Sequence, residues 1–124
     1  MESAPTIDLE DAYEMYFGSP IFEPEKTQST CRLGEKWNER LEVGDMIQLL
    51  PTKGNAPSDA DVGLVTGLAY QRFDELPAAW LEMEHDPTCR THSGLAEEMD
   101  SIYGDDFHRQ AMCTMVLFVP HVLD

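Results

Sequence analysis

The chain has 124 residues, of which 24 are acidic and only 8 are Lys or Arg, so its formal net charge is −16. This length is typical of one domain, and an apolar fraction of 42% excludes a disordered polyanion. The charge also excludes general electrostatic attraction to a phosphate backbone, although a local pocket could still capture a nucleotide or a short strand.

The N-terminal segment predicts a short helix. Apolar and aromatic residues recur near helical spacing over residues 7–17, Thr6 can cap the start, and Gly18 can end the helix. We therefore expect an N-terminal helix within residues 1–18, followed by residues 19–124 as the body of a single domain. The segment has neither the basic nor the apolar region of a signal peptide.

Four strands are expected after this helix. The second follows a Gly44–Asp45 turn and ends at Pro51, and the third contains Gly63 and Gly67, which permit a bend or a bulge. The expected strands are residues 30–33 ("TCRL"), 46–50 ("MIQLL"), 62–70 ("VGLVTGLAY") and 113–119 ("CTMVLFV").

Two further helices are expected between the third and fourth strands. "DELPAAWLEME" starts at Asp74 with Pro77 in its first turn, and "SGLAEEMDSIYG" has Ser93 as a cap and Gly104 as a stop. Few strands, one of them long and bent, indicate an α+β fold: a small mixed β-barrel with flanking helices.

Cysteine usage and hydropathy indicate a reduced, soluble, cytoplasmic protein. The three cysteines are an odd number without a disulfide framework, and no apolar run approaches the ~18 residues of a membrane span. His85, Cys89 and His92 match no standard zinc spacing, and Pro87 interrupts the intervening segment. No phosphate-binding loop or dinucleotide motif is present, so we expect neither a metal nor a cofactor.

The few cations are concentrated in one part of the chain. Residues 26–53 contain five of the eight and have a net charge of +1, whereas residues 1–25 have −7 and residues 54–124 have −10. Within "EKTQSTCRLGEKW", the cations Lys26 and Arg32 flank the hydroxyls of Thr27, Ser29 and Thr30. Such a cluster in an acidic protein indicates a place where an anion or a base is held.

Five segments resemble the ASCH domain family in order and spacing. They are "EKTQSTCR", "LEVGDMIQLLP", "VGLVTGLAYQRFDELP", "SIYGDDF" and "MVLFV", and together they span about residues 19–119. The family has a β-barrel related to the PUA domains that bind RNA. The resemblance therefore implies a PUA-like barrel that binds nucleic acid or nucleosides.

Some small ASCH proteins resemble amidohydrolases that deacetylate N4-acetylcytidine. In those proteins a Lys and a hydroxyl from the Lys-Thr motif act with a Glu that follows the third barrel strand. The resemblance implies Lys26, with Ser29 or Thr30 as the hydroxyl, because "KTQSTCR" has one residue more than the usual motif. The Glu is Glu82 or Glu84 in "WLEMEHD".

This chemistry is reasonable without the family. An amine with a lowered pKa can activate a hydroxyl, and a carboxylic acid can protonate a leaving amine. A base also needs hydrogen-bonding groups and an aromatic face. The ligand-binding candidates are therefore Lys26, Thr27, Arg32, Trp37, Tyr70 and Phe73.

Three functions from different classes follow. The first is an ASCH-type module that recognises a nucleoside, a modified base or a short single-stranded RNA or DNA. The second is the amidohydrolase. In the third, the acidic surface mimics nucleic acid and inhibits a protein partner.

Overall fold

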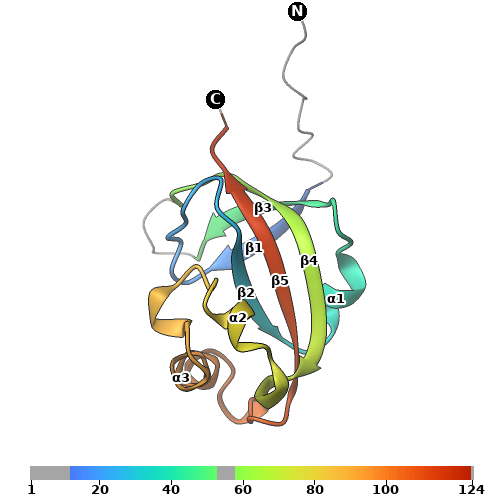
Figure 1. Ribbon diagram of the computed structural model, residues 1–124, viewed down its shortest axis with the longest axis vertical. Coiled ribbons are helices and arrows are strands. Elements are labelled where there is room, and N and C mark those ends of the chain that lie inside the picture. Colours follow the sequence, from blue (N-terminus) through green and yellow to red (C-terminus); the bar gives the residue numbers. More distant parts are fainter. Residues whose placement is uncertain (1–11, 53–57, 124) are drawn as a thin grey trace, which may run out of the picture.

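The computed structural model describes residues 12–52 and 58–123 (Figure 1). Five strands account for most of the regular structure: β1 (Tyr13–Phe17), β2 (Gln28–Leu33), β3 (Met46–Pro51), β4 (Val62–Arg72) and β5 (Met112–His121). The α-helices are α1 (Lys36–Arg40), α2 (Ala78–Leu81) and α3 (His92–Tyr103). Short 3₁₀ turns lie at Phe73–Glu75, Pro87–Cys89 and Gly104–Asp106.

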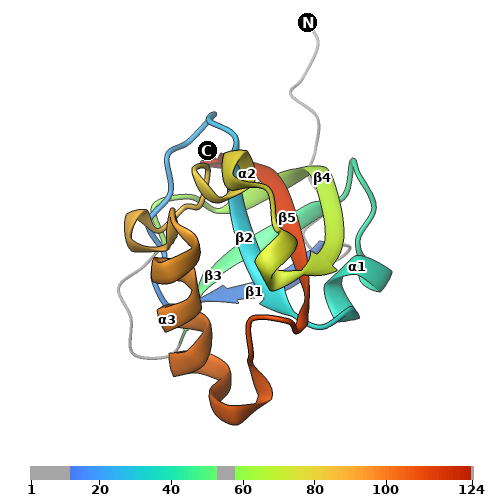
Figure 2. The ribbon, with the colours of Figure 1, turned by 60° about the horizontal axis from the view of Figure 1, so that its bottom comes forward.

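The strands form one mixed sheet with the order β1-β3-β4-β5-β2. β1 runs parallel to β3, and the other neighbouring strands are antiparallel. This confirms the predicted α+β fold with a mixed sheet and flanking helices. The sheet is not closed into a barrel, because β1 and β2 remain the two edges of an open, strongly curved sheet (Figures 1 and 2). Side chains connect these edges instead: the Arg32 guanidinium of β2 lies 4.7 Å from the centre of the Phe17 ring of β1.

All four predicted strands are confirmed as β2, β3, β4 and β5. The predicted irregularity in β4 is also present, as a register shift between Val65 and Gly67. A Cβ atom on Gly67 would lie 3.0 Å from the Leu117 side chain, so glycine lets β5 approach closely here.

The predicted N-terminal helix is wrong over its described part, because residues 13–17 form β1. Met15 and Phe17 are buried and their neighbours in the strand are exposed, which is the alternation of a half-buried strand. Pairing with β3 satisfies one edge of the backbone and outweighs a weak helical pattern. Residues 7–11 of the predicted helix lie outside the described residues.

The two later helices differ in outcome. The predicted C-terminal helix is confirmed as α3, with Thr91 rather than Ser93 as its cap and with Gly104 ending it at φ 59°. The helix predicted over residues 74–84 shrinks to a 3₁₀ turn and the four-residue α2. The rest of that segment leaves helical geometry to pair with the sheet.

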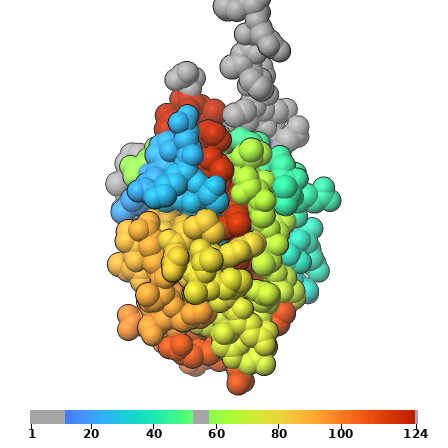
Figure 3. Space-filling view, in the orientation of Figure 1, coloured from blue at the N-terminus to red at the C-terminus, as the bar shows by residue number. Residues whose placement is uncertain are grey.

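Residues 83–85 run along the free edge of β2. The Ser29 amide donates to the Met83 carbonyl at 2.8 Å, and the His85 amide donates to the Ser29 carbonyl at 3.1 Å. The pairing covers an exposed strand edge and fixes Glu84 and His85 beside β2. Figure 3 shows the yellow and orange residues of this part of the chain against the blue residues that lead into β2.

Two hydrophobic clusters hold the fold together. One packs the sheet against α2, α3 and their connections, and includes Phe73, Leu81, Leu95, Met99 and Met115. The other lies among β1, β3, β4 and β5, and includes Met15, Ile47, Leu49, Val65 and Phe118. No helix in the described ranges is long and apolar enough to cross a membrane.

Candidate functional site

A cavity of about 370 Å³ lies where β1, β2 and the segment from Glu84 to α3 meet. Its lining combines aromatic, apolar and ionisable side chains, among them Tyr16, Thr30, Arg32, Glu84, Met99 and Tyr103. β2 contributes Thr30 and Arg32, which are two apart in the strand and therefore point to the same side of the sheet. A cavity of this size is in the range of small-ligand sites.

Arg32 is the cation of this cavity. Its Nε atom is buried without a hydrogen-bond acceptor, and no carboxylate among the described residues lies within 4.0 Å of its guanidinium. Its described contact is the face of the Phe17 ring. Burial lowers the pKa of the arginine, but an arginine remains charged in proteins. A buried N–H group without an acceptor is costly, so the position of this Nε atom calls for an explanation.

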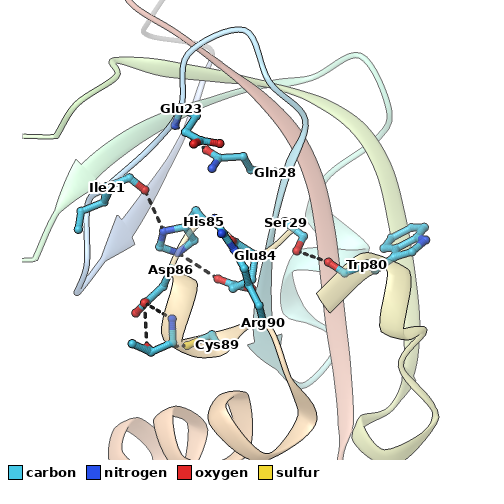
Figure 4. Close-up of polar contacts among 11 residues, drawn as sticks. Ile21, Glu23, Gln28, Ser29, Trp80, Glu84, His85, Asp86, Cys89 and Arg90 are labelled. Atoms are coloured by element: carbon cyan, nitrogen blue, oxygen red, sulfur yellow. Dashed lines mark hydrogen bonds and ion pairs between the residues drawn. The ribbon is translucent and has the colours of Figure 1, made fainter. Parts of the chain in front are cut away.

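Glu84 and His85 form a buried pair beside Arg32. Glu84 is 3% exposed, and its Oε1 atom lies 3.2 Å from His85 Nε2. His85 Nδ1 lies 3.3 Å from the Ile21 carbonyl oxygen (Figure 4). Because a carbonyl only accepts, Nδ1 carries the proton, and Nε2 of a neutral ring is left as an acceptor.

Burial favours the neutral forms of both side chains. It raises the pKa of the Glu84 carboxyl well above 4.5, with the charge of Arg32 opposing the shift. It lowers the pKa of His85 from 6.5 to about 4. The contact is therefore best described as a carboxylic acid that donates from Oε1 to a neutral imidazole. Glu84 Oε2 is then a carbonyl-type acceptor, and it is buried without a partner.

The backbone around this pair is fixed by local contacts. Arg90 Nε donates to the Glu84 carbonyl at 3.0 Å, and the Asp86 carboxylate accepts from the amide and hydroxyl of Thr88 (Figure 4). Helix α3 packs so closely that a Cβ atom on Gly94 would lie 2.0 Å from the Thr88 carbonyl oxygen. The loop that carries Glu84 is thus held between β2 and α3.

The cysteines of the cavity are unsuited to nucleophilic chemistry at neutral pH. Burial raises the pKa of Cys89 to about 12. The pKa of Cys31 is also raised, by its contact with Cys113 and by burial. All three cysteines are buried and unpaired, and the thiolate is the reactive form of cysteine.

The structure brings together three of the residues expected at a site: Thr30, Arg32 and Glu84 all line the cavity. The alternatives left open by the sequence lie in different surroundings. Ser29 is fully buried and its Oγ donates to the Trp80 carbonyl at 2.6 Å, while Glu82 is exposed and does not line this cavity.

The other candidates lie elsewhere. Lys26 is exposed on the loop before β2, where its amine pairs with Glu23 at 2.9 Å, and Thr27 beside it is exposed too. Neither residue lines this cavity, nor do Tyr70 and Phe73. Phe73 is a core residue, and the centre of its ring lies 5.0 Å from the centre of the Phe107 ring. Trp37 lines a second groove next to the cavity.

Sequence reasoning missed most of the cavity lining, including Tyr16, His85 as a partner of Glu84, Met99 and Tyr103. Met99 and Tyr103 are four residues apart on α3, so helical spacing places them on one face. That face could have been read from the sequence. The contact of Glu84 with His85 could not, because it depends on the pairing of residues 83–85 with β2.

Comparison with solved structures finds the same architecture in an ASCH domain from Lactobacillus crispatus JV V101. The TM-score is 0.55 and the sequence identity 10%, over 77% of this chain and 64% of that one, so this chain spans less than two thirds of that structure. No protein-family model and no curated protein matches the sequence. At this identity the likeness concerns the fold alone, and it confirms the ASCH-like fold implied by the resemblance.

Proposed function

We propose that this ASCH-like chain is a binding module that captures a single nucleobase in the cavity between Arg32 and Glu84. One observation carries the proposal. Arg32 and Glu84 line the same cavity and each has a buried polar atom without a partner. An unsatisfied buried group costs about 1–3 kcal/mol, and a ligand that supplies the missing partner removes that cost on binding.

The two groups are chemically complementary to a base edge. Arg32 Nε donates, and Glu84 Oε2 accepts when the proton of the carboxyl is on Oε1. Each common base has a hydrogen-bond acceptor next to an N–H donor on its edge. Aromatic side chains of Tyr16 and Tyr103 and the apolar Met99 supply the flat contacts that a base requires.

The same geometry favours binding over amide hydrolysis. Hydrolysis through a Lys–hydroxyl pair needs an amine beside a free hydroxyl. The Lys26 amine is paired at the surface with Glu23, and the Ser29 hydroxyl is occupied by the Trp80 carbonyl. Thr30 lines the cavity, but no lysine lines it in the described part of the chain.

Calorimetric titration with the four common ribonucleosides and with N4-acetylcytidine tests the proposal. We expect at least one nucleoside to bind without turnover, and Arg32→Met to weaken that binding about tenfold or more, because hydrogen bonds to charged groups contribute about 1.5–3 kcal/mol. Glu84→Gln keeps the shape of the side chain and tests its hydrogen bonding. Arg109→Ala removes an exposed cation that lines neither cavity and is the matched control.

Two results would contradict the proposal. One is the absence of binding by every nucleoside. The other is equal binding by the wild type and a folded Arg32→Met protein. Release of acetate from N4-acetylcytidine that depends on Lys26 would instead support the amidohydrolase.

A further inference from the structure

A second groove, of about 560 Å³, adjoins the base cavity. Its lining comes mainly from β1 and from α1, which follows directly after β2 (Figure 2). Tyr16, Arg32 and Tyr103 line both the groove and the cavity, so the two are continuous at these side chains. A segment of chain that fills the groove therefore also covers one edge of the cavity.

The groove contains two neighbouring cations, Lys36 and Arg40. The Lys36 amine lies 5.6 Å and the Arg40 guanidinium 5.7 Å from the centre of the Trp37 ring. Both residues are exposed, and because they are four apart on α1 their charges repel each other. No carboxylate of the described residues lies within 4.0 Å of either. Glu14 of β1 lines the groove too, but its carboxylate accepts from the Tyr16 hydroxyl at 3.1 Å. The described part of the chain thus leaves both cations without an ion pair.

Aromatic rings lie beside these cations. Tyr13 is 41% exposed and meets the half-buried Trp37 edge to face, with ring centres 6.4 Å apart. Each ring offers an apolar surface, and the Trp37 face is the one that the two cations approach. A groove of this composition fits a segment in which acidic side chains alternate with apolar ones.

Such a segment directly precedes β1 in the sequence. Residues 1–11 contain four acids and neither Lys nor Arg, and residues 7–11 read "IDLED". β1 begins at Tyr13, which itself lines the groove. One residue extends the chain by at most about 3.6 Å, so Asp11 is tethered within about 7 Å of Tyr13 and Asp8 within about 18 Å. The acids can therefore reach the cations of α1 without any change in the described fold.

We propose that residues 7–11 bind in the groove of their own chain and partly cover the base cavity. The acids of this segment neutralise Lys36 and Arg40, while Ile7 and Leu9 supply apolar contacts for the aromatic rings. The docking itself does not depend on the proposed function. Its consequence, autoinhibition of the base cavity, rests on that function and adds a regulation to the same site.

Two other occupants are chemically similar but less favoured. A separate acidic peptide, or the same segment of a second copy, must approach a chain of charge −16 from solution. The chain's own segment is tethered beside the groove, and a short tether gives an effective concentration in the millimolar range. Attachment to β1 therefore favours residues 7–11 of the same chain.

The experiment uses the full chain and has two readouts. The first is ¹⁵N relaxation of the amides of residues 7–11, together with the indole signal of Trp37, which is assigned by its loss in Trp37→Phe. The second is calorimetric affinity for the best-binding nucleoside, which is uncharged and thus insensitive to the general charge of the surface. The variants are Asp8→Asn/Glu10→Gln/Asp11→Asn, Lys36→Gln/Arg40→Gln and the charge-matched control Glu97→Gln/Asp100→Asn/Asp106→Asn, whose positions line neither the cavity nor the groove.

We expect the amides of residues 7–11 to relax like those of β1 in the wild type and like a mobile chain end in the first two variants, with a shift of the Trp37 indole signal. A segment docked about four-fifths of the time lowers the apparent affinity for the nucleoside about fivefold. Each of these variants therefore binds the nucleoside about fivefold more tightly than the wild type. Combining them adds nothing further, because both remove the same contact, and the control changes neither readout.

The outcomes separate this inference from the proposed function. If residues 7–11 relax as a mobile chain end in the wild type, the docking is overturned while the base site stands. If they are docked and no nucleoside binds, the docking stands and the proposed function fails. Equal nucleoside affinity in all variants of a docked protein would overturn the autoinhibition. Docking that appears only at high protein concentration would assign the segment to the groove of a second copy and overturn the inference.

Discussion

The pH dependence of stability is the sharpest consequence of the buried pair. His85 is 7% exposed, and its ring stacks on Phe22 and meets Phe17 edge to face. Burial lowers its pKa from 6.5 to about 4, so on acidification the unfolded chain takes up this proton before the folded protein does. The stability contributed by neutral His85 is complete above pH 6.5 and is lost as the pH falls to about 4. A pKa difference of one unit between the folded and unfolded states corresponds to about 1.4 kcal/mol. The free energy of unfolding therefore falls by about 3 kcal/mol over this pH range.

Glu84 acts in the opposite direction. Its folded pKa is raised, so the folded protein binds this proton more tightly, and the associated stability is present at low pH and declines as the pH rises above 4.5. The two contributions partly cancel in the wild type. The perturbation is therefore made in a Glu84→Gln background, where the His85 shift persists because burial is its main cause.

The assay is urea unfolding at a series of pH values from 7 to 4. Glu84→Gln is compared with Glu84→Gln/His85→Asn, whose amide can still donate to the Ile21 carbonyl. Protonation of the many surface carboxylates is common to both proteins and cancels in the comparison. We expect the histidine-containing protein to lose about 3 kcal/mol more of its free energy of unfolding over this range. Parallel curves for the two proteins would refute the buried, neutral His85.

Three further predictions concern stability. Arg32→Met should leave the free energy of unfolding in urea unchanged or raise it by about 1 kcal/mol, since it removes a buried Nε–H group that has no acceptor. A large loss would show that Arg32 has a structural role. Gly94→Ala should lower the midpoint of thermal unfolding, because its Cβ atom would lie 2.0 Å from the Thr88 carbonyl oxygen, although alanine usually stabilises a helix. An unchanged midpoint would mean that the loop containing Thr88 moves freely. Ser29→Ala should cost about 1 kcal/mol in urea unfolding through the lost bond to the Trp80 carbonyl, and no cost would indicate that the hydroxyl is free.

Most strands could be predicted because their sequences carry strong local signals. Turn residues border β3, and the apolar run in β5 is bounded by Pro120. β1 could not be predicted, because its five residues, three of them aromatic, fit both a helical and an alternating pattern. What decides the outcome is the parallel pairing of β1 with β3, a long-range contact without a local signal.

The lining of the cavity was predicted only in part. Thr30 and Arg32 were expected from the cluster of cations and hydroxyls and from the resemblance, and both line the cavity. The choice of Glu84 over Glu82 depends on the alignment of residues 83–85 with β2, which the sequence leaves open. Lys26 was expected at the site from the cluster of cations and from the resemblance. Its loop lies before β2, where solvent and Glu23 satisfy the amine, and its catalytic role stays a prediction.

The most direct test of the account observes Arg32 itself. The Nε–H group of Arg32 gives a separate signal in ¹H–¹⁵N spectra, assignable by its loss in Arg32→Met. On titration with the best-binding nucleoside, we predict that this signal shifts as the orphan donor gains an acceptor, together with the amides of residues 30–32, 84–86 and 99–103. Binding that leaves the Arg32 Nε–H signal unmoved, or shifts centred on the Lys26 loop, would contradict the base site.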